Sequence, residues 1–186
     1  VFVCAAWRLL DHRQESRMSD VVSSTFAAVY VPFLASFVVL MMAAWHSAWV
    51  FVVFELMVIA NDTGGWAAGV MFGKHPMAPA LSPKKSWEGF AGSALTAIVV
   101  GVVGLWLLGA SWWWGVVAGI SIAFVGTMGD LTESLIKREA GLKDMSQILP
   151  GHGGVLDRVD ALLMSAPVAY FIFAWALPGI SWESSH

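Results

Sequence analysis

Long apolar runs, separated by short polar segments, make up most of this chain of 186 residues. An α-helix needs about 20 consecutive apolar residues to cross the hydrocarbon core of a bilayer. The runs that reach or approach this length cover 21–44, 89–109, 111–129 and 161–177. This pattern predicts an all-α fold, a polytopic membrane helix bundle, with Pro32 as a kink in its first long span.

A further apolar run, 48–73, is interrupted by Asn61-Asp62-Thr63-Gly64-Gly65. If 66–73 crossed the membrane separately, Lys74 and the lysines after it would lie on the opposite side from the other basic segments. We therefore expect 48–73 to form one broken helix with its break at Asn61-Asp62. Such a break is tolerated in a membrane where it lines a cavity or is covered by protein.

The basic residues predict the orientation of the bundle. All ten Lys and Arg residues fall within 8–17, 74–85 and 137–158, and the turns near His46 and Ser181 have none. The positive-inside rule places the three basic segments in the cytoplasm. We expect 74–88 to be a polar loop stiffened by its prolines, and the active site to face the cytoplasm.

Composition supports a membrane protein and excludes several other classes. The chain is 58% hydrophobic and 12% charged, about half the charge of a typical soluble domain, and its net charge of −3 argues against nucleic-acid binding. The single Cys4 excludes a disulfide framework. The opening VFVCAAW lacks the charged start of a signal peptide, so we expect the chain to begin inside a membrane helix.

Charge is concentrated in the segment 130–160, which holds six of the thirteen acidic residues and four of the ten basic ones. Asp130 and Glu133 are three residues apart at the start of a predicted helix, and Lys137 follows four residues later, so the three share one face. A metal or phosphate site is one interpretation of this face. A surface ladder of salt bridges is an equally good one from this helix alone.

The next part of this segment combines a glycine turn with two carboxylates. The turn Pro150-Gly151-His152-Gly153-Gly154 leads into a helix, as in anion-binding sites built from backbone N–H groups, although an ordinary glycine turn would look the same. Asp157 and Asp160 then share a helix face with Arg158 between them, which suits Mg²⁺. Capping of the helix N-terminus would explain one Asp and leave the second unexplained.

Three charged positions outside 130–160 are further candidates. Asp62 lies at the predicted helix break, and an acid within or near a membrane is a functional hypothesis by default. Glu55 lies deeper, and its role as a structural partner or a site residue stays open. Lys84 and Lys85 bring two ammonium groups to a proline-rich loop, where they could bind phosphate or simply flank a membrane span.

Taken together, these residues resemble the phosphatidate cytidylyltransferases, also called CDP-diacylglycerol synthases. The resemblance is carried by Ser134 to Arg138, by Lys143-Asp144 and by the run from Leu149 to Asp160, and also by Asn61-Asp62 and the segment 72–89. Ser86 stands where many members have Thr. Members usually carry further N-terminal membrane helices, so we expect 1–186 to be a single membrane-embedded domain without them.

The resemblance implies that CTP and phosphatidate react to CDP-diacylglycerol and pyrophosphate with Mg²⁺, in the bilayer of a bacterial cell membrane, and it allows a homodimer. It implies metal ligands at Asp130, Asp157 and Asp160, with Lys137 and Arg158 as further catalytic residues. Residues expected to bind substrate are Asp62, Ser82, Lys84, Lys85, Arg138, Lys143, Asp144, His152, Gly153 and Gly154. Among these basic groups we expect Lys137 and Arg158 to contact CTP and Lys85 to contact phosphatidate.

Two other functions remain open from the sequence. A CTP-dependent lipid-alcohol kinase would transfer the γ-phosphoryl group and release CDP, so its products would differ. A membrane transporter would move a solute without turning over CTP. The transporter is the weaker alternative because it has no evident use for the Asp157 and Asp160 pair beside a glycine turn.

Overall fold

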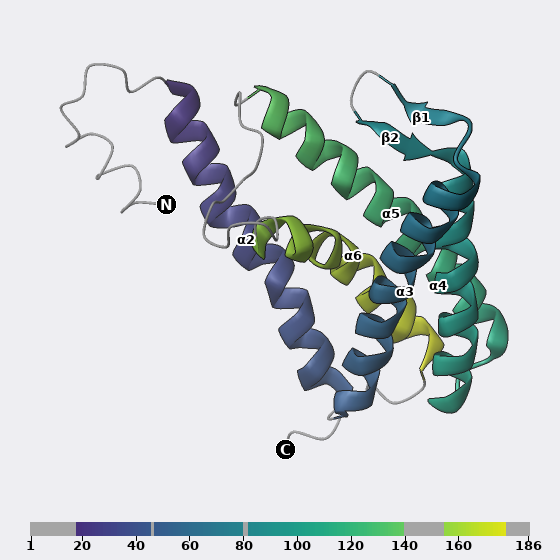
Figure 1. The fold of residues 1–186 in the computed structure, drawn as a ribbon. Coiled ribbons are helices and arrows are strands. Elements are labelled where there is room, and N and C mark those ends of the chain that lie inside the picture. The colour runs from purple at the N-terminus through teal and green to yellow at the C-terminus, as the bar shows by residue number, and fades with distance from the viewer. Residues whose placement is uncertain (1–17, 46, 80–81, 140–154, 178–186) are drawn as a thin grey trace.

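The computed structural model describes residues 18–45, 47–79, 82–139 and 155–177 as a bundle of long helices with one small hairpin (Figure 1). The predicted helical membrane bundle is confirmed, and the hairpin is an addition to the expected all-α fold. The elements, in chain order, are α2 (Met18–Trp45), α3 (Ala48–Phe72), β1 (Pro76–Ala78), β2 (Ser82–Ser86), α4 (Trp87–Leu107), α5 (Trp112–Glu139) and α6 (Val155–Ala176).

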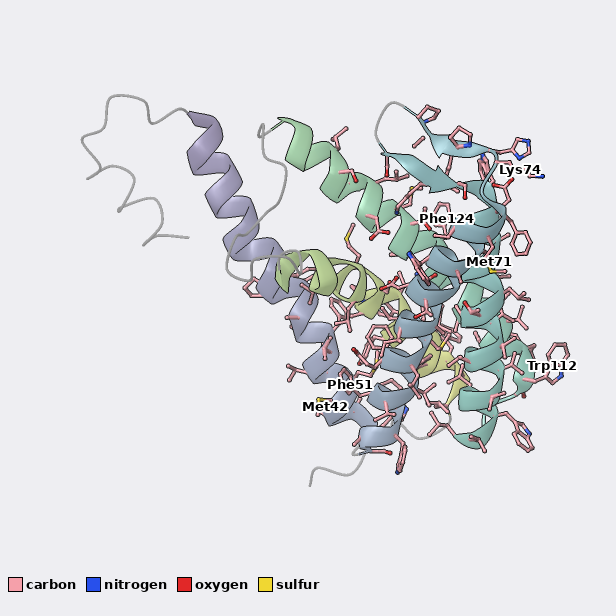
Figure 2. The ribbon with its side chains drawn as sticks, viewed as in Figure 1. Met42, Phe51, Met71, Lys74, Trp112 and Phe124 are labelled. Carbon is pink, nitrogen blue, oxygen red and sulfur yellow. The ribbon has the colours of Figure 1, made fainter. Side chains whose placement is uncertain are left out.

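The outer surface of the bundle is apolar, as it must be in contact with lipid. Three of the described helices are long and apolar enough to cross a membrane: α3, α4 and the part Trp112–Thr132 of α5. Large side chains such as Trp106 and Trp175 are 66% and 79% exposed, and Trp112 points away from the bundle in Figure 2. A soluble protein would bury most of this surface, so the chain is an integral membrane protein.

The predicted break at Asn61-Asp62 is wrong, because α3 continues as an α-helix from Ala48 to Phe72. Helix α4 supports this stretch. The Oγ1 of Thr96 donates to the carbonyl oxygen of Ala60 at 2.7 Å, and the Oγ of Ser93 donates to that of Asn61 at 2.7 Å. The glycines that suggested a break instead allow α4 to approach closely: a Cβ at Gly64 would lie 2.1 Å from Oγ1 of Thr96.

The expected loop at 74–88 contains the hairpin. Strands β1 and β2 pair antiparallel, with Pro76 opposite Ser86 and Ala78 opposite Ser82. A two-stranded hairpin has two edges, so it tolerates the prolines that would break a central strand. His75 joins its base to α4: Nδ1 of His75 lies 2.6 Å from Oε1 of Glu88, and the carbonyl of His75 accepts from the backbone N–H of Trp87.

The sequence suggested that a new helix starts at Asp130. The structure has no helix start there. Helix α5 continues through Asp130 to Glu139 and so carries the membrane span and the first charged turns on one rigid rod. In Figure 1 the end of α5 lies at the same end of the molecule as the hairpin. The α2–α3 junction and the turn between α4 and α5 lie at the opposite end. The described basic segments therefore share one end, as the topology prediction requires.

Close contact between α4 and α5 depends on glycine. A Cβ at Gly115 would lie 2.4 Å from Cα of Val102, and one at Gly119 would lie 2.5 Å from Cα of Ile98. These are backbone atoms, which cannot move aside as a flexible side chain can. Small residues at such a contact let two membrane helices gain van der Waals packing along their backbones.

We expect Gly119→Ala to destabilise the folded protein by about 1–3 kcal/mol, the usual cost of overpacking. Thermal unfolding in detergent would measure this. The matched control is Gly129→Ala, whose added Cβ would meet only the side chain of Met164, at 3.3 Å. Equal unfolding temperatures for the two variants would contradict this account of the α4–α5 contact.

Candidate active site

A cavity of about 310 Å³ is lined by residues of α3, α4, α5 and the hairpin. The hairpin follows the end of α3 and leads directly into α4, at one end of the bundle (Figure 1). Helices α3 and α5 contribute polar groups from inside the helix, and α4 contributes one from its second turn. Its polar and charged lining consists mainly of Asn61, Asp62, Lys85, Ser93, Thr127 and Asp130.

An ion pair joins the hairpin to α5 across the cavity. Nζ of Lys85 lies 2.5 Å from Oδ2 of Asp130, and it also donates to the carbonyl oxygen of Thr127 at 3.5 Å. The two side chains are 25% and 39% exposed. Lys85 is held in place by its neighbour Ser86, whose Oγ caps α4 by accepting from the backbone N–H of Gly89. The pair is therefore partly shielded and built on fixed backbone.

A second acid enters the cavity from α3. Nδ2 of Asn61 donates to Oδ1 of Asp62 at 3.1 Å, while the main chain of Asn61 is fixed by Ser93. Oδ1 of Asn61 is buried and has no hydrogen-bond partner among the described residues. Asp62 interacts electrostatically with both Asp130 and Lys85. The cavity thus gathers oxygen donors from two different helices around one ammonium group.

Apolar side chains also line the cavity. They are Trp66 from α3, Met77 from β1 and Phe90 from α4. Gly65, Gly69 and Gly89 line it as well, and leave the helix backbones close to the cavity. A ligand with a charged group and an apolar body would therefore match this mixed lining.

The described charges fit a divalent cation such as Mg²⁺. Among the described cavity residues, Asp62 and Asp130 bring two carboxylates against the single ammonium of Lys85, so a divalent cation would offset the excess negative charge. Mg²⁺ binds one or two carboxylates and completes its shell with water and substrate phosphates. Within the described ranges no three His, Cys, Asp or Glu residues form a complete ligand cluster, and Mg²⁺ does not require one.

The family model for the cytidylyltransferase family matches residues 1–176 of this chain. The chain belongs to the cytidylyltransferase family. It is 42% identical over 186 aligned residues to a Mycobacterium bovis protein named phosphatidate cytidylyltransferase. The alignment covers 92% of this chain and 60% of that relative. Relatives of the same name from Mycobacterium leprae and Haemophilus influenzae are both 40% identical to this chain. The first alignment covers 91% of this chain and 60% of the relative. The second covers 69% of this chain and 47% of the relative.

The suspected relationship to this family is confirmed. The chain spans about 60% of the length of the Mycobacterium bovis relative. The comparisons therefore show the family of this chain, and its own reaction is proposed below.

Among the site residues expected from the sequence, the structure brings Asp62, Lys85 and Asp130 together in one cavity. Ser82 lies in β2 but does not line the cavity, and Glu55, whose role was open, does not line it either. Lys84 also lies in β2, and Lys137 and Arg138 lie in the last turns of α5. The side chains of these three basic residues lie outside what the structure describes.

Helix α6 packs against α5. A Cβ at Gly126 would lie 3.9 Å from Oγ of Ser165, and one at Gly129 would lie 3.3 Å from Cγ of Met164, so α5 and α6 run antiparallel where they meet. The backbone of Asp160 belongs to the first turns of α6, about one helical turn before Met164.

The other predicted site residues lie wholly or partly outside the described part of the structure. The side chains of Asp157, Arg158 and Asp160 lie outside the described part, although their backbone belongs to α6. Also outside the described residues are Lys143, Asp144, His152, Gly153 and Gly154.

Among the uncharged polar residues of the cavity, Asn61, Ser86, Ser93 and Thr127 were not expected from the sequence as site residues. Helical spacing could have identified two of them. Thr127 is three residues before Asp130 and so shares its face of α5, and Asn61 directly precedes Asp62. Nothing in the sequence around Ser93 distinguishes it from other small residues of a membrane helix.

Proposed function

We propose that this chain transfers the cytidylyl group from CTP to phosphatidate and releases pyrophosphate, forming CDP-diacylglycerol. The observation that carries the proposal is the cavity that joins Asp62, Lys85 and Asp130 at one end of a membrane-embedded bundle. Membership of the cytidylyltransferase family supports the same reaction, and so does the name of the Mycobacterium bovis relative.

The chemistry requires neutralisation of charge more than proton transfer. The phosphate of phosphatidate is already ionised, so it can attack the α-phosphorus of CTP without a strong base. Two anions must come together in line, and catalysis therefore depends on positioning and on positive charge. Lys85 can supply one such charge from the hairpin. The apolar side chains of Trp66, Met77 and Phe90 in the lining are suited to the part of the lipid that adjoins its headgroup.

Mg²⁺ belongs to the proposal as the required cofactor. The excess of carboxylate over ammonium among the described cavity residues supports it. When bound, Mg²⁺ would neutralise the triphosphate and favour pyrophosphate as a leaving group. We assign Asp130, Asp157 and Asp160 as its ligands and add Asp62 as a fourth carboxylate at the cavity. Lys137 and Arg158 remain assigned to CTP.

The proposal places the cavity on the cytoplasmic side of a bacterial cell membrane, where CTP is available. The shared location of the hairpin and the end of α5 supports this orientation through the positive-inside rule (Figure 1). Lys74 stands at the same end in Figure 2. A homodimer is compatible with the proposal, and light scattering of the purified protein would test that assembly.

We expect a cysteine at Ala78 in the hairpin to be inaccessible from outside the cell, and one at Ser47 to be accessible. The reason is that these positions lie at opposite ends of α3, which spans the membrane once. Labelling of intact cells with a membrane-impermeant maleimide, in a Cys4→Ser background, would measure this. Labelling of both positions from outside would contradict the orientation.

The proposed activity is tested by measuring pyrophosphate release from CTP with two lipid acceptors. We expect release when phosphatidate is supplied with Mg²⁺, and none when diacylglycerol replaces it, because diacylglycerol lacks the attacking phosphate. Formation of CDP with a lipid alcohol would indicate a kinase instead. No turnover of CTP with any acceptor would contradict the proposal.

A further inference from the structure

The carboxylate that we assign to the metal already has a positive partner. Nζ of Lys85 lies 2.5 Å from Oδ2 of Asp130, and the carbonyl oxygen of Thr127 is its second acceptor. An ammonium carries three N–H donors, and Asp130 and Thr127 accept from two of them. A substrate phosphate that contacts Lys85 therefore competes with Asp130 for its single positive charge.

A divalent cation on Asp130 would compete with this ammonium. Both are attracted to the same carboxylate, and the pair is only 25% and 39% exposed, so water screens their mutual repulsion incompletely. The lysine is the partner that can leave, because a flexible four-carbon chain carries its charge. The strand that carries it stays in place through the capping bond from Gly89 to Ser86.

We propose that Lys85 is an exchangeable counter-ion: it holds Asp130 until a divalent cation binds, and its released ammonium then pairs with the phosphate of the incoming phosphate monoester. The proposal rests on the proposed function. It assigns an order to binding, with the cation before the lipid phosphate. It also explains why the basic group lies on a hairpin over the cavity and not on one of the helices.

The first consequence is a change in the reactivity of Lys85. We expect Mg²⁺, added without CTP or lipid to the purified protein in detergent, to raise the rate of acetylation of Lys85 by about fivefold, the factor that loss of a partly exposed ion pair would give. Pulse labelling with an amine-reactive ester and mass spectrometry of the peptides would measure the rate. Lys74, which is exposed on the same surface, is the internal control and should change little.

The second consequence is an increase in affinity when the lysine is removed. We expect Lys85→Met to bind Mn²⁺ about fivefold more tightly than the unmodified protein, as measured by the electron paramagnetic resonance signal of free Mn²⁺. Lys85→Arg keeps the competing charge and should bind Mn²⁺ as the unmodified protein does. Lys74→Met controls for the general loss of one positive charge, and Asp130→Asn should weaken binding.

A purely structural role for Lys85 predicts the reverse. Lys85→Met would then bind Mn²⁺ equally or less tightly, and Mg²⁺ would leave the acetylation of Lys85 unchanged. Either result overturns the proposal. Turnover of CTP and phosphatidate, measured on the same preparation, distinguishes failure of the proposed function from failure of the exchange. Absence of turnover counts against the proposed function. Turnover without a response of Lys85 counts against the exchange alone.

Discussion

Asp130→Asn should lower the Mg²⁺-dependent formation of CDP-diacylglycerol by a factor on the order of 100 or more. Asn has nearly the same size as Asp but cannot neutralise a divalent cation, so the cavity loses one of its two described carboxylates. It also leaves the ammonium of Lys85 without its partner at 2.5 Å. Steady-state kinetics at several Mg²⁺ concentrations would measure the effect.

The control for this variant is Glu88→Gln. It removes a carboxylate from the same end of the molecule, where Glu88 pairs with the exposed His75 outside the cavity. An exposed pair of this kind contributes about 1 kcal/mol or less, so activity should stay within a few-fold of the unmodified protein. If Asp130→Asn were as active as Glu88→Gln, the assignment of Asp130 would be wrong.

Asp62→Asn should lower kcat/KM by about tenfold or more and raise the Mg²⁺ concentration needed for half-maximal activity. Lys85 can balance the charge of only one of the two carboxylates that line the cavity, Asp62 and Asp130. Loss of the Asp62 charge therefore weakens the attraction of the cavity for the cation. Titration of activity with Mg²⁺ at saturating CTP and phosphatidate would separate this effect from loss of substrate affinity.

Helix α3 provides a matched control, because Glu55 lies two turns before Asp62 on the same helix. It is a second acid in the same membrane-spanning segment, but it does not line the cavity. We expect Glu55→Gln to leave the Mg²⁺ dependence unchanged. A larger effect at Glu55 than at Asp62 would move the functional acid deeper into the membrane and contradict the site.

The positions of the helices could be predicted from the sequence, because long apolar runs have few alternatives in a bilayer. The continuity of α3 could not. The stretch from Asn61 to Gly65 suggests a helix break when read in isolation. In the structure it is helical, and the hydroxyl groups of Ser93 and Thr96 on another helix support it. The hairpin was missed because its first strand, Pro76–Ala78, is too short to leave an alternating pattern of polar and apolar residues.

The charged members of the site were predictable because charge is conspicuous in so apolar a chain. Asp62, Lys85 and Asp130 were each identified from the sequence and lie together in the structure. Their arrangement was not predictable. Lys85 and Asp130 are 45 residues apart, and nothing along the chain indicates that one contacts the other. The neutral residues Asn61 and Ser93 were missed because uncharged polar groups commonly join membrane helices without any functional role.

The fate of labelled phosphate tests the central claim most directly. The purified protein would be incubated with phosphatidate, Mg²⁺ and CTP that carries ³²P at either the α- or the γ-position. Cytidylyl transfer predicts that the α-label enters the lipid fraction and that the γ-label leaves as pyrophosphate. Entry of the γ-label into lipid, or retention of both labels in water-soluble nucleotide, would contradict the account.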